Sequence, residues 1–311
     1  MSDVSGSRSA SGASLSERVA ATLAVLGGRT AVAAQRFGPL PPLPSRRMTV
    51  MPAQVTPEDS AANGHTPERD ARQPGSAPVD AATSVSIRAD DVFPAASLAK
   101  LPIAVELMRR ADLGQFDMGE RFDTASEPRV GGAGVLDFLD PSTQLTLREL
   151  CMLMLIVSDN TASNFILDLV GMGEVNETMS RLNLTHTKLA RRFMDAAARA
   201  SGRDNVTSAG DMLALLSLIR GNALPGGRSL REMLGAQQSF SELVEGWLPP
   251  TASLAHKDGT LDGVVHDAGI LSGPGGVAMY CVLTAEQQDV PAARSAVGRI
   301  VRMLWDEWRI G

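Results

Sequence analysis

The hydrophobic pattern changes its period twice along this chain, and that change limits the folds open to it. Residues 15–26 have the pattern of an amphipathic helix, and residues 30–37 that of a strand. Helical patterns fill the middle of the chain, and alternating patterns return near the C-terminus before a last helical stretch. The two ends are therefore expected to supply a sheet, and the middle a helical cluster. The pattern predicts an α/β fold of the α+β kind.

Caps, prolines and glycines bound the expected elements. Ser14 with Glu17 and Thr146 with Glu149 have the spacing of capping boxes. The expected helices are 15–26, 98–113, 145–157, 161–170, 208–219 and 291–310, and the expected strands are 30–37, 84–88, 252–257, 264–271 and 277–284.

Residues 19–34 admit a second interpretation, as a secretion signal. The apolar run 19–26 follows arginines, and Ala-Val-Ala-Ala at 31–34 is typical of a cleavage site. Gly-Gly-Arg-Thr at 27–30 interrupts the run, and this favours a helix followed by a strand. No convincing signal peptide is therefore predicted, and the sequence as it stands favours a cytoplasmic location.

Proline usage indicates how the domain is organised. Nine of the 18 prolines fall between residues 39 and 78, among charges and few aliphatic side chains, as is typical of an inserted loop. We predict a Ser/Gly-rich disordered tail at 1–13 and a single domain at 14–311. Its sheet part would take about 14–90 and 236–311, its helical part about 91–235, and the Pro-rich insertion about 39–80.

Composition argues against several function classes. A net charge of -6 without a long basic cluster gives no electrostatic footprint for nucleic acid, and no apolar run is long enough for a membrane span. Cys151 and Cys281 lie in apolar runs, as buried thiols do. The four histidines form no metal-ligand spacing with each other or with cysteine. We expect no metal, no other cofactor and a monomer.

Three short motifs carry the chemistry. The first is Ser97-Leu98-Ala99-Lys100 at the head of a helix, the second is Ser158-Asp159-Asn160 between two helices, and the third is Lys257-Asp258-Gly259 on a strand. Lys100 follows Ser97 by three residues, and in a helix this spacing places both side chains on the same face, with Lys100 within reach of the Ser97 hydroxyl. A serine hydroxyl becomes a good nucleophile only when a base takes its proton, and a desolvated lysine near another cation such as Lys257 can be that base. Each motif alone is also compatible with an ordinary cap or a solvated charge.

Together, and in this order, the motifs resemble the signature of the class A β-lactamases and penicillin-binding serine hydrolases. The resemblance covers residues 15–310 except the Pro-rich insertion. It implies the serine β-lactamase/transpeptidase-like fold, an antiparallel sheet flanked by terminal helices plus an all-helical subdomain.

The resemblance also implies a role for each matching residue. Ser97 would be the nucleophile, Lys100 its base, and Ser158 the proton relay to the leaving nitrogen. Asn160 would bind the substrate amide, while Lys257, in the segment with Asp258 and Gly259, would bind a substrate carboxylate and support Ser158. The backbone N–H groups of Ser97 and Thr260 would form the oxyanion hole.

The sequence departs from the family where the acyl group is released. Relatives keep a glutamate that activates the deacylating water, and an arginine and an aromatic residue precede it. Arg192 and Phe193 match that pair, so Met194 stands in the place of the glutamate. Asp195, the next residue, is either a substitute base or an ion-pair partner of Arg191 or Arg192, and we favour the ion pair.

The third motif departs as well. Relatives have a hydroxyl where this chain has Asp258, which would repel an anion there or turn away and pair with Lys257. Relatives also pair the cysteine at the Cys151 position with a residue that is Ala104 here, so Cys151 is expected to be a free thiol.

We therefore expect a serine hydrolase that forms an acyl-enzyme on Ser97. The first hypothesis is β-lactam ring hydrolysis with slow deacylation. The alternatives are a D-amino-acid peptidase or esterase of the same superfamily, and a penicillin-binding sensor without turnover. The expected partner is a small β-lactam or acyl-peptide substrate, with no nucleic acid and no membrane span.

Overall fold

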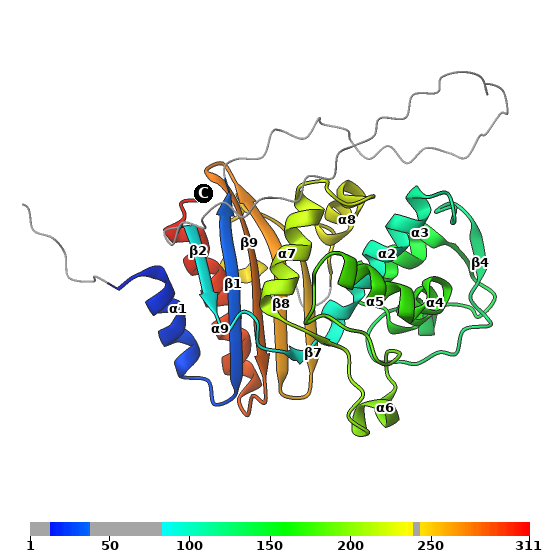
Figure 1. Ribbon diagram of the computed structural model, residues 1–311, viewed down its shortest axis with the longest axis horizontal. Helices are drawn as coiled ribbons and strands as arrows, with labels where there is room; N and C mark the ends of the chain where they lie inside the picture. Colours follow the sequence, from blue (N-terminus) through cyan, green and yellow to red (C-terminus); the bar gives the residue numbers. More distant parts are fainter. Residues whose placement is uncertain (1–12, 38–82, 239–242) are drawn as a thin grey trace, which may run out of the picture.

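Five antiparallel strands form the main sheet of the computed structural model, which describes residues 13–37, 83–238 and 243–311. The strands lie in the order β2-β1-β9-β8-β7, so neighbours in the sheet come from both ends of the chain (Figure 1). They are β1 (Arg29–Phe37), β2 (Ser84–Ile87), β7 (Ser253–Leu261), β8 (Val264–Gly273) and β9 (Gly276–Ala285). The central pairing joins β1 to β9, with Val32 opposite Val282.

Alternate residues of these strands enter two separate cores. In β1, Val32 and Ala34 pack with the terminal helices α1 (Leu15–Ala24) and α9 (Val290–Glu307). Ala31 and Ala33 point to the opposite face and join the core of the helical part. This arrangement confirms the predicted fold class, because a sheet built from the chain ends separates the terminal helices from a helical cluster.

Both terminal helices agree with their sequence patterns. Ser14 and Glu17 form the expected capping box of α1, and residues 29–37 follow as a central strand of the sheet. In α9, the predicted apolar stripe is buried at Val297, Ile300, Val301, Leu304 and Trp308.

The helical part lies on the other side of the sheet, with α7 packed directly on β1, β8 and β9 (Figure 1). Its helices are α2 (Lys100–Asp112), α3 (Leu147–Ile156), α4 (Asn160–Val170), α5 (Met172–Arg181), α6 (Ala196–Ala200), α7 (Ala209–Arg220) and α8 (Gly227–Leu234). Thr146 and Glu149 form the expected capping box of α3. Helices α5, α6 and α8 had no counterpart in the predicted set, nor had two small sheets, β3 (Phe93–Pro94) with β6 (Val206–Thr207) and β4 (Arg121–Asp123) with β5 (Gln144–Thr146).

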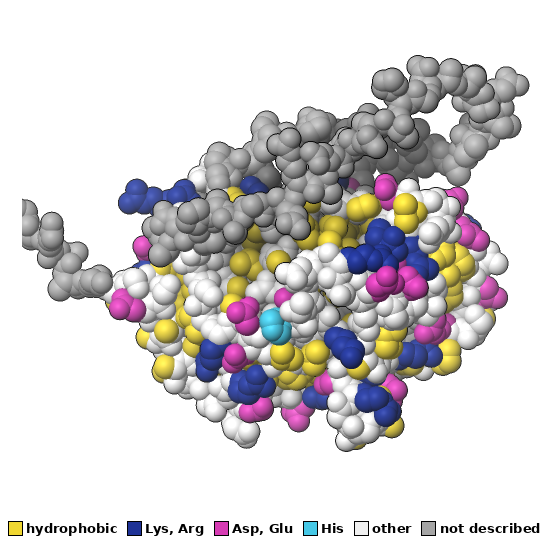
Figure 2. Space-filling model, viewed as in Figure 1, with side chains coloured by type: hydrophobic (Ala, Val, Ile, Leu, Met, Phe, Trp, Pro, Cys, Tyr) yellow, Lys and Arg dark blue, Asp and Glu magenta, His cyan; other side chains and the backbone are white. Residues whose placement is uncertain are grey.

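Several expectations concern single residues or segments. Cys151 and Cys281 are buried free thiols, as predicted. The predicted disordered tail, apart from Ala13, and the Pro-rich insertion at 39–80 lie outside the described residues. None of the helices in the described ranges is both long and apolar enough to cross a bilayer. On the face shown in Figure 2, basic and acidic side chains of the described residues are interspersed, without a large area of one sign.

Candidate active site

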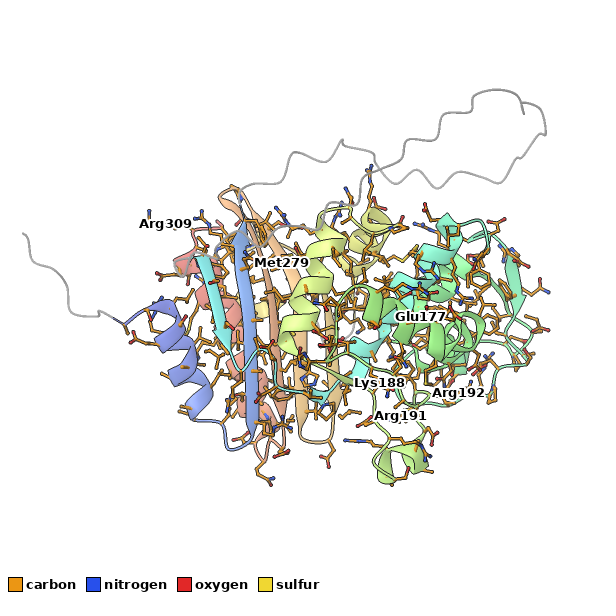
Figure 3. The ribbon with its side chains drawn as sticks, viewed as in Figure 1. Glu177, Lys188, Arg191, Arg192, Met279 and Arg309 are labelled. Atoms are coloured by element: carbon orange, nitrogen blue, oxygen red, sulfur yellow. The ribbon has the colours of Figure 1, made fainter. Side chains whose placement is uncertain are left out.

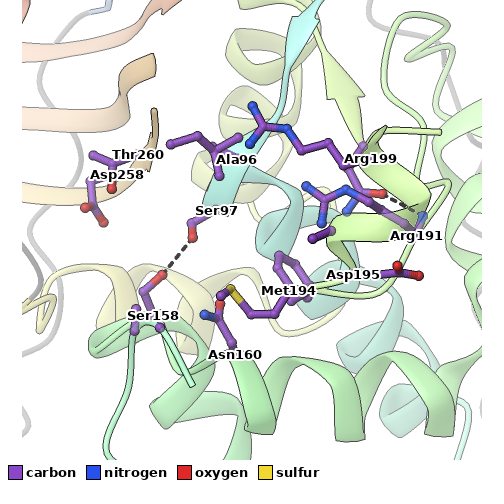
Figure 4. Close-up of a pocket in the computed structure, with 16 residues that line it drawn as sticks. Ala96, Ser97, Ser158, Asn160, Arg191, Met194, Asp195, Arg199, Asp258 and Thr260 are labelled. Atoms are coloured by element: carbon purple, nitrogen blue, oxygen red, sulfur yellow. Dashed lines mark hydrogen bonds between the residues drawn. The ribbon is translucent and has the colours of Figure 1, made fainter. Parts of the chain in front are cut away.

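The three motifs meet at one cavity of about 470 Å³ between the sheet and the helical part. Ser97 lies in η2 (Ala96–Ala99), a 3₁₀ turn that leads directly into α2. Ser158 comes from the loop between α3 and α4, and Asp258 and Thr260 come from β7. Figure 4 shows the Ser97 and Ser158 side chains facing each other in this cavity.

Ser97, Lys100 and Ser158 form a closed triangle of hydrogen-bonding atoms. Lys100 Nζ lies 3.1 Å from Ser97 Oγ and 2.9 Å from Ser158 Oγ. Ser158 Oγ donates to Ser97 Oγ over 3.0 Å. The predicted nucleophile is therefore in direct contact with both groups expected to handle its proton.

Lys100 is completely buried, and its surroundings favour the neutral amine. Burial lowers its pKa well below the ordinary 10.5, and the charge of Lys257 lowers it further, while Asp258 and Asp159 act in the opposite direction. Nζ also reaches two acceptors that cannot donate, the Ser158 carbonyl at 2.7 Å and Asn160 Oδ1 at 2.9 Å. A neutral amine has two N–H groups for these two oxygens and a lone pair that can accept the proton of a serine hydroxyl, so the contacts are compatible with the neutral form.

A strained backbone presents Ser158 and Asn160. Ser158 has a φ of 57°, a left-handed conformation that costs a non-glycine residue about 1–2 kcal/mol. The next residue, Asp159, holds the loop, since its Oδ2 accepts from Val135 N and Leu136 N at 2.7 Å each and its Oδ1 caps α4 by accepting from Ala162 N at 2.9 Å. A Cβ on Gly134 would lie 2.3 Å from Asp159 Oδ2, so only glycine allows this approach.

The Asn160 side chain is held at both ends. Its Oδ1 accepts from Lys100, and its Nδ2 donates to the Gly131 carbonyl at 3.0 Å. Asn160 lines the cavity, and its predicted role in binding a substrate amide stays a prediction.

Strand β7 meets the nucleophile turn through Gly259. A Cβ there would lie 3.2 Å from both Ser97 N and Ala96 Cβ, so a glycine lets the strand approach the backbone N–H of Ser97 closely. Thr260 follows on the same strand and lines the cavity. The two residues predicted to supply the oxyanion hole, Ser97 and Thr260, therefore belong to segments in contact.

Lys257 makes contacts other than those the resemblance implies. Its Nζ donates to Asp258 Oδ1 at 2.6 Å and to the Asp258 carbonyl at 3.2 Å. Within the described ranges, no hydrogen bond joins it to Ser158. Burial lowers the pKa of Lys257, and Asp258 opposes that shift. Of the two predicted possibilities for Asp258, the structure has the ion pair, with Asp258 still lining the cavity.

The expected ion pair of Asp195 with Arg191 or Arg192 is wrong. Asp195 Oδ1 instead accepts from Ala198 N at 2.9 Å and caps the short helix α6. Arg191 pairs with Asp204 at 2.7 Å, and Arg192 pairs with Glu127 and Asp168. These carboxylates are not adjacent to the arginines in sequence, so adjacency was a poor guide. Figure 3 labels Arg191 near α6 and Arg192 toward α4, the helix that carries Asp168.

Met194 lines the cavity beside Asn160 and is half exposed (Figure 4). Its φ of 63° is left-handed. Asn164 holds the preceding residue, accepting from Phe193 N at 2.8 Å and donating to the Phe193 carbonyl at 3.1 Å. Lys100 Nζ lies over the Phe193 ring, 4.8 Å from its centroid, and Phe193 lines the cavity.

The prediction missed several cavity residues, because no local motif marks them. They come from loops that only the fold brings to the site: Gly132, Ala133, Arg199 and Asn205. The positive φ values of Ala96 and Ser158 also had no sequence signal, since neither is glycine or asparagine.

The chain belongs to the Beta-lactamase enzyme family, whose model matches residues 76–308. It is 25% identical over 277 residues to the β-lactamase regulatory protein BlaB of Streptomyces cacaoi, covering 72% of this chain and 88% of that protein. It is 27% identical over 246 residues to β-lactamase AST-1 of Nocardia asteroides, covering 72% and 74%. In fold it is similar to a β-lactamase from Sphaerobacter thermophilus, with a TM-score of 0.74, 24% identity, and 96% and 97% of the two chains covered. The chain is thus β-lactamase-like, a member of a hydrolase family.

The hydrogen bonds of Asp159 lead to a prediction on stability. Asp159→Ala removes the acceptor of three backbone N–H groups from a buried loop, and we expect it to lower the free energy of unfolding by about 2–4 kcal/mol. Asp195→Ala is the matched control, since it also removes an aspartate cap but at an exposed one-turn helix, and it should cost about 1 kcal/mol or less. Urea unfolding of the two variants and the parent measures both values. Equal losses in the two variants would contradict the structural role given to Asp159.

Proposed function

We propose that this protein opens β-lactam rings by acylation of Ser97 and releases the acyl group slowly. The observation that carries the proposal is the contact of Ser97 Oγ with both Lys100 Nζ and Ser158 Oγ in an open cavity. A buried amine with a lowered pKa can take the serine proton, and the second hydroxyl can pass a proton on.

The acylation step follows from this geometry. Ser97 Oγ attacks the β-lactam carbonyl carbon while its proton moves to Lys100 Nζ. The backbone N–H groups of Ser97 and Thr260 would stabilise the oxyanion, a contribution that is typically worth about 100-fold in rate for each donor. The C–N bond of the ring then breaks as Ser158 delivers a proton to the nitrogen and regains one from Lys100.

For release of the acyl group, the residues that line the cavity offer no base placed as Lys100 is for acylation. Hydrolysis of the Ser97 ester needs a base that takes a proton from water as the water attacks. Met194 cannot do so, and the Asp195 carboxylate is engaged at the N-terminus of α6. Asp258, the other cavity carboxylate, is hydrogen-bonded to Lys257 and Gln237. The acyl-enzyme should therefore outlast the acylation step.

A long-lived acyl-enzyme also fits a second candidate function, a sensor of β-lactams. The similarity to a protein named as a β-lactamase regulatory protein favours this possibility. Hydrolase and sensor share the same first step on Ser97 and differ only in the lifetime of the adduct.

Intact mass and absorbance, followed together with a chromogenic cephalosporin, test the proposal. We expect a burst of ring opening of about one equivalent, an adduct on the protein, and slow turnover afterwards. Ser97→Ala should lose burst and adduct, whereas Ser201→Ala, the same change near α6, should keep both. An adduct that persists in Ser97→Ala would rule out Ser97 as the nucleophile. With neither adduct nor ring opening in the parent protein, from the cephalosporin or from its methyl ester, the β-lactam reaction itself would be wrong, and D-amino-acid peptides and esters become the substrates to screen.

A substitution at Met194 tests the account of release. Met194→Glu places a carboxylate at the cavity wall beside Asn160, and we expect it to speed decay of the adduct by about 10- to 100-fold with little change in the burst rate. Met194→Gln, of the same shape without the base, is the control and should leave the decay slow. Equal decay rates for the two variants would show that a missing base does not limit release.

A further inference from the structure

The two sides of the cavity differ in their charged groups. Figure 4 shows Asp258 and Thr260 on one side of the Ser97–Ser158 hydrogen bond, and Arg191, Asp195 and Arg199 on the other. Ser158, which would protonate the leaving nitrogen, lies toward the Asp258 side. A group carried by that nitrogen would therefore face Asp258, while the acyl group would face the arginines.

Lys257, a basic residue beside Asp258 on β7, is already paired with that carboxylate. Lys257 Nζ is completely buried, and its contact with Asp258 Oδ1 is 2.6 Å. The same Oδ1 accepts from Gln237 Nε2 at 2.7 Å, which holds the carboxylate in place between the lysine and the amide. An anion arriving here would meet the carboxylate that lines the cavity, and would have to displace it to reach the lysine.

Among the described residues, the strand β8 beside Asp258 brings another carboxylate. Asp267 is opposite Asp258 in the pairing of β7 with β8 and is fully buried. It accepts from Tyr280 Oη at 2.5 Å and contacts His256 Nδ1 at 2.9 Å. Glu245 lies 3.7 Å from the other nitrogen of that histidine. Around Lys257 and His256 there are thus three carboxylates for two basic groups.

We propose that Asp258 is a specificity-determining residue that disfavours acyl donors with a carboxylate on the leaving-group side, so that the preferred substrates are neutral or cationic there. The proposal rests on acylation of Ser97 as proposed above, and it names the substrate class for that reaction. Its physical basis is like-charge repulsion in a partly desolvated cavity, where Lys257 offsets part of the Asp258 charge and the remainder is worth about 10-fold in rate.

A matched pair of substrates tests the proposal. Benzylpenicillin and its methyl ester differ only in the carboxylate, which is charged in the acid and a neutral methyl ester in the other compound. Intact mass followed over time gives the rate constant for acylation of Ser97 by each compound. We expect the ester to acylate the parent protein about 10-fold faster than the acid. Asp258→Asn, which keeps the shape and an acceptor for Lys257, should lower this ester-to-acid ratio by about 10-fold, mainly by speeding the reaction with the acid. If Asp258→Asn folds poorly, Asp258→Thr serves as a second variant, and it is expected to lower the ester-to-acid ratio in the same way.

The control is Asp195→Asn, which removes a negative charge from the opposite wall and should change the ratio by less than about 3-fold. A parent protein that reacts with the acid at least as fast as with the ester would overturn the proposal, and so would an unchanged ratio in both Asp258 variants. When neither compound labels Ser97, the proposed acylation is wrong. The preference for a neutral leaving-group side is then tested by binding alone. NMR titration measures the affinity of the Ser97→Ala protein for each compound; tighter binding of the ester supports the preference, and tighter binding of the acid overturns it.

Discussion

The burial of Lys100 is the interaction on which the site depends. An ammonium taken out of water costs several kcal/mol unless other groups compensate it, and a lysine can avoid that cost by losing its proton. Here two carbonyl-type oxygens and two hydroxyls surround Nζ within 3.1 Å. These groups come from η2, from the loop before α4 and from Asn160, the first residue of α4, so the amine joins the segments that bring Ser97 and Ser158 together. A neutral Lys100 both fits its surroundings and is able to accept the proton of Ser97.

Strained backbone at three places brings the cavity residues into position. Ala96, Ser158 and Met194 all have a left-handed φ, at a cost of about 1–3 kcal/mol each that the surrounding contacts must offset. Each segment has a hydrogen-bonded anchor nearby: Ala95 N donates to the Asn205 carbonyl at 2.7 Å, Asp159 binds three N–H groups, and Asn164 binds both backbone groups of Phe193. The anchors lie in the helical part or in its small sheets, so that part serves to fix the geometry of the site.

The sequence was informative where an effect is local. The change of hydrophobic period predicted the sheet, and spacing within motifs predicted the contact of Lys100 with Ser97, because three residues of helix give a fixed direction. It was less informative where the partner is distant, because the carboxylates that pair with Arg191 and Arg192 depend on how the loops fold back. The cap that Asp195 makes at Ala198 is local, and it was missed because the short helix α6 was not predicted. For Asp258, the sequence left two possibilities open, repulsion of a substrate anion and an ion pair with Lys257. Adjacent residues on a regular strand point to opposite faces, so the sequence alone did not predict a contact between these two neighbours.

The protonation state of Lys100 is the most direct test of this account. The chain has only three lysines, Lys100, Lys188 and Lys257, so lysine labelled with ¹³C and ¹⁵N gives three side-chain signals, and Lys188→Arg identifies one of them. An NMR pH titration of the resting protein should show the Lys100 amine with a pKa well below the ordinary 10.5, because it is buried and Lys257 is near. A Lys100 side chain that stays an ammonium up to that ordinary value would contradict its role as the base that activates Ser97.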